Sequence, residues 1–266
     1  MISAMSGTSG VASLALCAVA FAPPQAPAAG GESEAPSAEM SVGCVNCGEY
    51  DYSDGTTPKK TYKENWRQMY AENPADIWFK EDTVPSRDPN RCLEAVAARP
   101  PLSNDIVTLE GKCPEGSTRR RYARRLVYEI GGRRIAFYGM HLVAEGHVSK
   151  KKGPDGKSPS QRLRQLQFAG LLEDAKAFDG AVLTGDFNAQ EPWEYDIFKK
   201  AGYTCANCSD RFGVTATLRN IPADNIIVSP GIAIASFKVI KQPNLDTDHF
   251  PLVARLRFER QREGGR

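Results

Sequence analysis

Residues 121–142, with the sequence RYARRLVYEIGGRRIAFYGMHL, restrict the fold more than any other part of the chain. Two runs that alternate between apolar and polar residues flank the pair Gly131-Gly132. Paired glycines accept the positive φ angles of a two-residue β-turn, so this segment predicts an antiparallel hairpin. A chain that contains such a hairpin is not built from parallel βαβ units alone.

Helices and further strands surround this hairpin in the sequence. The clearest helix is predicted at residues 158–178, with Ser160 as its N-cap and an apolar stripe formed by Leu163, Leu166, Leu171 and Leu172. Two shorter helices are predicted at 61–74 and 192–202, and strands at 40–46, 75–82, 180–187, 223–230 and 250–258. The mixture predicts the α/β class, and the hairpin favours a β-sandwich flanked by helices over a simple parallel repeat.

The two ends of the chain differ in composition from its middle. Residues 11–22, VASLALCAVAFA, form an uncharged apolar run of signal-peptide length, too short to span a bilayer, and a Pro/Ala/Gly/Ser-rich stretch follows. We therefore expect a signal peptide and disordered linker at 1–39, one folded domain at 40–260 and a disordered tail at 261–266. The leader predicts a secreted or periplasmic protein with no membrane span after its removal, although the usual basic residues before the apolar run are absent.

Composition adds only a weak restriction on function. Hydrophobic residues make up 41% and charged residues 25% of the 266 residues, as is usual for a soluble globular protein. The formal net charge is +2, and residues 1–39 hold three acids but no lysine or arginine, so the remainder is slightly more basic. A mild basic excess suits a phosphate-bearing substrate, and many neutral binders carry as much.

Seven cysteines are present, and six remain if Cys17 leaves with the leader. An even number in an exported protein predicts disulfides, for which Cys92–Cys113 is the best single pairing. The motifs CVNC at 44–47 and CANC at 205–208 leave structural zinc as one alternative, and buried free thiols are another.

Polar residues stand at the ends of several predicted apolar strands. In LTGDFNAQEP, Asp186 and Asn188 follow a buried strand, and side chains two apart on an extended segment point the same way. They can therefore reach one cation or one phosphoryl group together, or form a turn with Asx hydrogen bonds. Glu81 and His141 also end strands, so several strand ends can converge on one polar cleft.

These polar positions occur in short motifs whose order resembles that of one protein family. The motifs are VGCVN with Asn46, DIWFKED with Glu81, GMHL with His141, GDFNA with Asp186 and Asn188, ADNIIVS with Asp224, and TDHFPL with Asp248 and His249. From about Ser41 to the end of VARLRF, the chain resembles the endonuclease/exonuclease/phosphatase superfamily, the DNase I-like metal-dependent phosphoesterases. The resemblance implies a four-layer α/β/β/α sandwich, in which two packed mixed sheets carry the site at one rim.

The same resemblance implies a metal site. Glu81 would be the main ligand, with Asn46 and Asp248 near the ion, and Mg²⁺ would be the cofactor, with Mn²⁺ or Ca²⁺ as alternatives. Two positions depart from the family pattern. Glu81 is preceded by Lys80, where the family more often has a neutral residue, and is followed by Asp82, which can share or shift the metal position. Asn225 follows Asp224 where an aromatic residue is common.

The resemblance also implies catalytic roles. Asp186 would orient or deprotonate the attacking water, and Asn188 would hold a phosphate oxygen. His249, oriented by Asp224, would contact the scissile phosphate, which leaves Asp186 and His249 as alternative general bases. His141 would stabilise charge or help to protonate the leaving group.

Three functions follow from this reading. The first is an exported Mg²⁺-dependent phosphodiesterase, a monomer that acts on DNA or RNA and uses Arg124 and Arg125 to hold substrate phosphate. The second is a phosphatase or phospholipase that acts on a small or lipid phosphate. The third is an inactive homologue that binds nucleic acid or a protein, and the intact set of acids, amides and imidazoles argues against it.

Overall fold

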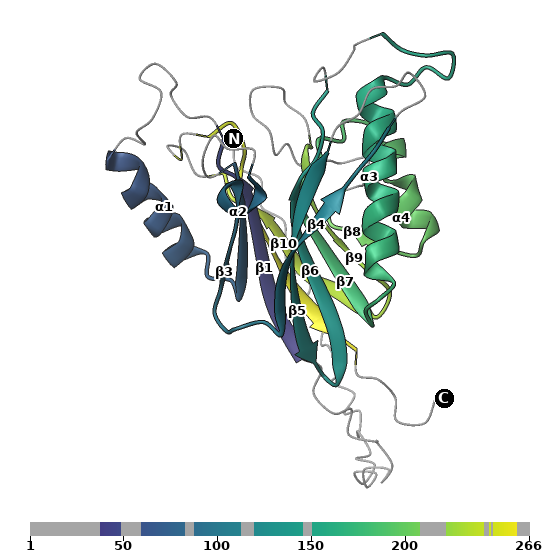
Figure 1. Ribbon diagram of the computed structural model, residues 1–266. Coiled ribbons are helices and arrows are strands. Elements are labelled where there is room, and N and C mark those ends of the chain that lie inside the picture. The colour runs from purple at the N-terminus through teal and green to yellow at the C-terminus, as the bar shows by residue number, and fades with distance from the viewer. Residues whose placement is uncertain are drawn as a thin grey trace, which may run out of the picture. The chain divides into compact units, whose positions relative to one another are not determined.

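The computed structural model describes residues 38–48, 60–82, 88–112, 120–145, 151–207, 222–241, 245 and 247–259. Within these residues the chain forms two β-sheets (Figure 1). The first has the order β10-β11-β1-β2-β3, with bounds Ile232–Val239, Leu252–Phe258, Ala38–Asn46, Ile77–Glu81 and Leu93–Ala97. The second has the order β4-β5-β6-β7-β9-β8, with bounds Ser103–Leu109, Arg121–Ile130, Arg133–His141, Gly180–Asp186, Asp224–Val228 and Thr204–Cys205. Both sheets are mixed, since β1 runs parallel to β2 and β6 runs parallel to β7.

The two sheets pack face to face through an apolar core. Phe79 of β2, Phe137 of β6, Val182 of β7 and Leu252 of β11 belong to one cluster of buried side chains that both sheets supply. Alternate residues of each strand point into this layer, as expected for stacked sheets about 10 Å apart. The core therefore holds the strand ends of the two sheets at a fixed separation.

Helix α1 (Lys60–Glu72) covers the outer face of the first sheet (Figure 1). Its Trp66 and Met69 pack with Val45 of β1 and Trp78 of β2 in a separate buried cluster. These aromatic and sulfur-containing side chains fill the space between the helix and the sheet. A short helix, α2 (Pro89–Cys92), leads into the edge strand β3.

Helices α3 (Pro159–Ala175) and α4 (Asp196–Lys200) cover the outer face of the second sheet (Figure 1). Phe168 of α3 and Phe198 of α4 lie 4.9 Å apart between ring centroids and belong to a cluster with strand residues of that sheet. The order helix, sheet, sheet, helix confirms the predicted four-layer sandwich.

The predicted hairpin is formed by β5 and β6. Ile130 pairs with Arg133, and the two residues between them, Gly131 and Gly132, have φ angles of 61° and 76°. A two-residue turn with two positive φ angles fits the right-handed twist of the flanking strands, and glycine adopts it without steric cost. The local sequence therefore determines the connection that leads to His141.

The start of α3 differs from the prediction. Ser158, not Ser160, is the N-cap: its Oγ accepts a hydrogen bond from Gln161 N, and the side chain of Gln161 accepts one from Ser158 N. This reciprocal capping box places Pro159 at the first helical position, where its missing N–H is not needed. Leu166 is 42% exposed, so it does not belong to the buried face of the helix.

Strands β3, β4 and β10, and the two-residue strand β8, had no counterpart in the sequence analysis. β3 and β4 are edge strands, and β10 is the edge of the first sheet at its other side. Edge strands bury only part of their side chains, so the alternation that marks a strand in sequence is weakened. In β10, for example, buried, half-buried and exposed residues follow one another irregularly.

The predictions on cysteines and chain ends can be compared with the structure only in part. Cys92 is a free thiol, and Cys113, its partner in the predicted disulfide, lies outside the described residues. β1 begins at Ala38, two residues before the predicted start of the domain. The apolar leader and the tail 261–266 lie outside the described residues. Among the described residues, every helix is too short or too polar to cross a membrane.

We expect Gly139→Ala to destabilise the fold, because a Cβ at Gly139 would lie 2.1 Å from Phe79 Cδ1 between the sheets. Overpacking of this kind typically lowers the free energy of unfolding by about 1–3 kcal/mol. The control is Gly170→Ala on α3, where a Cβ has room and the nearest atom is 3.7 Å away. That change should raise stability by about 0.5–1 kcal/mol. Urea denaturation measures both, and equal effects would contradict the close sheet packing at Gly139.

Candidate active site

Strand register brings the predicted site residues to one rim of the sandwich. Asn46 pairs with Glu81 at the ends of parallel strands β1 and β2. His141 pairs with Asp186 at the ends of parallel strands β6 and β7, and Asp186 pairs with Asp224 at the start of antiparallel β9. Side chains that lie far apart in sequence therefore meet because their strands end together.

Asp186 is the centre of the polar contacts. Its Oδ2 accepts a hydrogen bond of 3.0 Å from Asn46 Nδ2, and it lies 3.5 Å from His141 Nε2 and 3.8 Å from His249 Nε2. The side chain is almost fully buried. A buried carboxylate needs donors or positive charge around it, and here one hydrogen-bond donor and two imidazoles come from three separate segments of the chain.

His249 and Asp224 form a buried pair. The two atoms His249 Nδ1 and Asp224 Oδ2 are 2.8 Å apart. Burial lowers the pKa of His249, but the neighbouring carboxylates of Asp224 and Asp186 outweigh it and raise the pKa to about 10. The imidazole is therefore protonated at neutral pH, with Nε2 facing Asp186.

The loop before β11 is tied to β1 beside this pair. Thr247 Oγ1 donates a hydrogen bond of 2.8 Å to the carbonyl oxygen of Asn46 and accepts one of 3.1 Å from His249 N. Asp248 Oδ1 lies 3.6 Å from His249 Nε2, so Asp248 is at the rim as expected. Thr247 is a contributor that the sequence analysis did not identify.

Asp82 is the partner of His141. His141 Nδ1 lies 3.0 Å from Asp82 Oδ2, which leaves Nε2 directed to Asp186. Burial raises the pKa of Asp82, but His141 and then Arg121 outweigh it and the pKa is lowered. Burial likewise lowers the pKa of His141, and the charges of Asp82 and Asp186 outweigh it and raise the pKa. Asp82, which the sequence analysis considered as a residue that can share or shift the metal position, contacts the histidine.

Glu81 is fully buried with one oxygen available for a ligand. Its Oε2 accepts a hydrogen bond of 2.9 Å from Asp186 N, whereas Oε1 has no hydrogen-bond partner among the described residues. Burial, together with the charges of Asp224 and Asp186, raises the pKa of Glu81 well above its ordinary value. An acid placed among acids without a donor on one oxygen is costly unless a cation is bound.

Glycine is required beside this oxygen. Gly185 has a φ of 125°, and a Cβ there would lie 2.5 Å from Glu81 Oε1 and 2.1 Å from Met140 O. Only a residue without a side chain leaves room for the Glu81 carboxylate against β7. The position of the Glu81 carboxylate therefore depends on a glycine at residue 185.

The donor set fits a hard divalent cation. Glu81 Oε1 is orphaned, and carboxylate and carboxamide oxygens are the ligands that Mg²⁺, Mn²⁺ and Ca²⁺ prefer. Ligand atoms of Asp186, Asp224 and His249 also lie within 4.8 Å of one another. His249 Nδ1 is bonded to Asp224, and the raised pKa of His249 keeps the imidazole protonated, so neither ring nitrogen has a lone pair for a metal. We therefore regard those three as a group beside the cation site rather than as its ligands.

Asn188 lies at the rim but not in the conformation expected from sequence. Its φ is 51°, so the chain leaves the extended conformation, and Asn188 N donates a hydrogen bond of 2.8 Å to Asp186 Oδ1. Its Nδ2 donates to Leu142 O at 3.1 Å. The alternative turn with an Asx hydrogen bond is therefore formed, and Asp186 Oδ2 still faces the cluster.

Arg124 and Arg125, predicted to hold substrate phosphate, are engaged by the protein itself. Arg124 Nε donates to Leu93 O at 2.6 Å, and Arg125 forms an ion pair of 2.8 Å with Asp174 on α3. Neither arginine is among the described residues that contact Asp186. The basic residue whose charge acts on the His141–Asp82 pair is Arg121, at the start of β5.

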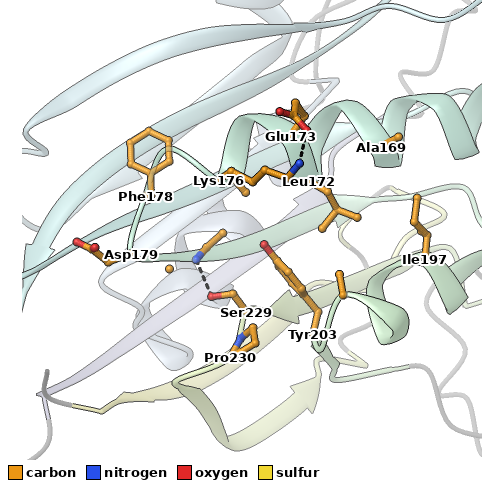
Figure 2. A pocket seen from close by; sticks show the side chains of 14 residues that line it. Ala169, Leu172, Glu173, Lys176, Phe178, Asp179, Ile197, Tyr203, Ser229 and Pro230 are labelled. Carbon is orange, nitrogen blue, oxygen red and sulfur yellow. Dashed lines mark hydrogen bonds and ion pairs between the residues drawn. The ribbon is translucent and has the colours of Figure 1, made fainter. Parts of the chain in front are cut away.

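A pocket of about 580 Å³ lies at the opposite end of β7. Figure 2 shows its lining, which includes Leu172 and Phe178 from α3 and the segment after it, and Tyr203 and Pro230 from loops. It reaches β7 at Gly180, and a seven-residue strand spans about 20 Å, so the pocket is remote from Asp186. The polar rim and this apolar pocket are separate features.

Comparisons with known proteins agree with this architecture. No family model matches the sequence, and no curated protein matches it. Among solved structures, an endonuclease/exonuclease/phosphatase from Bacteroides vulgatus has a TM-score of 0.62 at 16% identity, covering 84% of this chain and 100% of that one. The human Nocturnin catalytic domain with bound sulfate has a TM-score of 0.59 at 15% identity, covering 83% and 94%. ANGEL2, described as a 2′,3′-cyclic phosphatase and complexed with adenosine-2′,3′-vanadate, has a TM-score of 0.59 at 14% identity, covering 83% and 96%.

The chain has the endonuclease/exonuclease/phosphatase fold. The likeness extends over more than four-fifths of this chain and almost the whole of each neighbour, at low sequence identity. Proteins with one fold can differ in activity, so function has to be argued from the residues at the rim.

Within this endonuclease/exonuclease/phosphatase fold, we expect Glu81→Gln to stabilise the metal-free protein at pH 8. The raised pKa of Glu81 means that its contribution to stability is full below the usual glutamate pKa and is lost as pH rises. The isosteric amide removes this loss, so the variant should melt above the wild type in EDTA at pH 8 but not at pH 4.

In Mg²⁺ the wild type should instead melt at a higher temperature than Glu81→Gln. Ligand at 100 times its Kd stabilises a protein by about 2.7 kcal/mol, and Glu81→Gln should forfeit most of that gain. Glu94→Gln, which removes an exposed acid on β3, is the control and should keep the full Mg²⁺ shift. The measurement is the melting temperature of each protein in EDTA and in Mg²⁺. If Mg²⁺ raises the melting temperature of Glu81→Gln as much as that of the wild type, Glu81 is not a ligand.

Proposed function

We propose that this protein is an exported, divalent-metal-dependent phosphoesterase that hydrolyses phosphodiester bonds in nucleic acid. One observation carries the proposal: Asn46, His141 and His249 meet at a single carboxylate oxygen of Asp186. Phosphodiester hydrolysis requires an activated water, stabilised charge on phosphate oxygens and a protonated leaving group. Carboxylates and imidazoles held this close together can supply all three.

The cation would be held by Glu81, with Asn46 and Asp248 beside it. When bound, Mg²⁺ supplies positive charge that polarises the phosphate and stabilises the leaving oxygen. The orphaned Oε1 of Glu81 supports this assignment. Mn²⁺ or Ca²⁺ would suit the same oxygen ligands.

The water-activating group in the proposal is Asp186. Its Oδ2 lies near both imidazoles, so it can orient a water and accept its proton while donors on either side stabilise its charge. Asn188 keeps Asp186 in place through Oδ1. The second N–H of Asn188 Nδ2 remains able to donate to a phosphate oxygen, since one N–H is used by Leu142 O.

The two histidines act on the phosphate and the leaving group. Asp224 fixes His249 through Nδ1, so Nε2 is presented to a phosphate oxygen. Asp82 forms an ion pair with His141 Nδ1 at 3.0 Å, and His141 Nε2 can donate a proton to the departing oxygen. Each imidazole is thus oriented by its own carboxylate.

Two similar structures support a nucleotide phosphoester as the substrate. ANGEL2 is described as a 2′,3′-cyclic phosphatase bound to an adenosine vanadate, and the Nocturnin domain carries a sulfate anion. An anion and a nucleoside phosphate mimic in related folds fit a phosphoester site here.

The apolar run at 11–22 supports export, and N-terminal sequencing of the mature protein from the growth medium or periplasm would test it.

We expect Asp186→Ala and His249→Ala each to lower kcat by about 10²–10⁴-fold, because each removes a group that acts on the reacting atoms. Lys176→Ala, which removes an exposed ion pair on α3, is the control and should retain full activity. The assay is hydrolysis of bis(p-nitrophenyl) phosphate in Mg²⁺, with EDTA abolishing turnover. Full activity in either site variant would remove its assigned role.

A substrate panel separates nucleic acid from small or lipid phosphates. Purified protein is assayed on DNA, RNA, inositol phosphates and sphingomyelin with Mg²⁺. We expect turnover of DNA or RNA, and a KM that rises steeply with salt because phosphate contacts release counterions. Turnover confined to inositol phosphates or sphingomyelin would instead establish the phosphatase or phospholipase alternative. Metal-dependent turnover on none of the substrates would overturn the proposed activity.

A further inference from the structure

Arg164 is a fully buried arginine on α3, among the largest side chains that the protein excludes from solvent. It lies one and two turns before Phe168 and Leu171, whose side chains pack on the second sheet. Arginines are almost never fully buried unless their charge is paired. Its partners therefore define what the residue does.

One partner is the segment that follows His141. Arg164 Nη1 donates a hydrogen bond of 3.0 Å to the carbonyl oxygen of Val143, and Nη2 lies 3.2 Å from Glu145 Oε2. Gln167, one turn further along α3, accepts a hydrogen bond of 3.4 Å from Val143 N. Both backbone polar groups of Val143 are thus held by α3.

The other partner is the segment that follows Asn188. Arg164 Nε donates to Glu194 Oε2 at 2.7 Å, and Nη2 donates to Oε1 at 3.1 Å, a bidentate pair. Glu194 is also fully buried, and its Oε1 accepts hydrogen bonds from Gln190 N and Glu191 N. Glu194 therefore fixes the backbone just beyond Asn188.

These two segments also contact each other at the rim. Leu142 N donates to Asp186 O at 2.9 Å, and Asn188 Nδ2 donates to Leu142 O at 3.1 Å. Any shift of one segment would therefore move the other. A single guanidinium, attached to a rigid helix, reaches both.

Stability alone does not account for this buried pair. Removing two charges from water costs several kcal/mol per ion, and well-packed apolar residues often replace such pairs without loss. What apolar residues cannot supply is a planar fork with fixed hydrogen-bond directions. The ion pair specifies the positions of the backbone groups that it touches.

We propose that Arg164 and Glu194 are positioning residues of the active site, which fix the segments bearing His141 and Asn188 relative to Asp186. This inference rests on the proposed phosphoesterase function. In this role, neither Arg164 nor Glu194 contacts the substrate. A displacement of about 1 Å in a catalytic group can reduce the rate about 10²-fold, so kcat should depend on the pair.

The test uses Glu194→Gln and Arg164→Lys, with Asp174→Asn as the matched control. Asp174 is the acid of another arginine pair on α3, with Arg125, but contacts neither segment. We expect Glu194→Gln to lower kcat by about 10- to 100-fold on bis(p-nitrophenyl) phosphate, with KM changed less than about threefold. Asp174→Asn should leave kcat unchanged even if its Tm falls as much as that of Glu194→Gln.

Hydrogen exchange gives a readout that does not need activity. In Glu194→Gln the backbone amides of residues 142–145, 189–191, 193 and 194 should exchange faster, while those of β6 and β7 should not change. If wild-type protein hydrolyses nothing, the proposed function fails and the exchange result still decides whether the pair orders these segments. Should Glu194→Gln not fold, Arg164→Lys provides the same comparison. Site variants that match Asp174→Asn in both kcat and segment exchange would overturn the positioning role.

Discussion

The buried carboxylate of Asp186 is the constraint on which the rest of the site depends. Its Oδ2 contacts Asn46 from the first sheet and His141 from the second, and its backbone N–H donates to Glu81 of the first sheet. The two sheets are therefore joined at the rim by polar contacts as well as through their apolar middle. A charge removed from water in this way requires its donors to be held in place, and close packing of the sheets achieves that.

Much of the fold could be predicted because the strongest local signals coincide with buried elements. The β5–β6 hairpin follows from two glycines with positive φ, and β7 follows from the apolar run Ala181–Leu183 within a strand that is buried along its whole length. The edge strands β3, β4 and β10 could not be found in this way, because half-exposed strands do not select a regular pattern of apolar residues. Ser160 failed as the cap because Ser158 precedes a proline that suits the first helical position.

The candidate site could be predicted as a set of strand ends, but not as a set of contacts. Short motifs located Glu81, Asp186 and His249. Strand register places Glu81 beside Asn46 and Asp186 beside His141, and the packing of the two sheets brings Glu81 and His249 to Asp186. Asp82, which pairs with His141, has a φ of 49°, and no local sequence pattern predicts that backbone conformation. Arg164 resembles any polar residue of an amphipathic helix until packing shows that it is buried.

The parallel pairing of β1 with β2 and of β6 with β7 has a consequence for folding. Parallel strands cannot be joined by a tight turn, so both pairs form only after intervening chain has been closed into loops. The hydrogen bond between Asn46 and Asp186 joins residues 140 positions apart, and such distant contacts form late and slowly. The rim should therefore be among the last regions to become ordered during refolding, and recovery of a competent site should lag behind recovery of the β5–β6 hairpin.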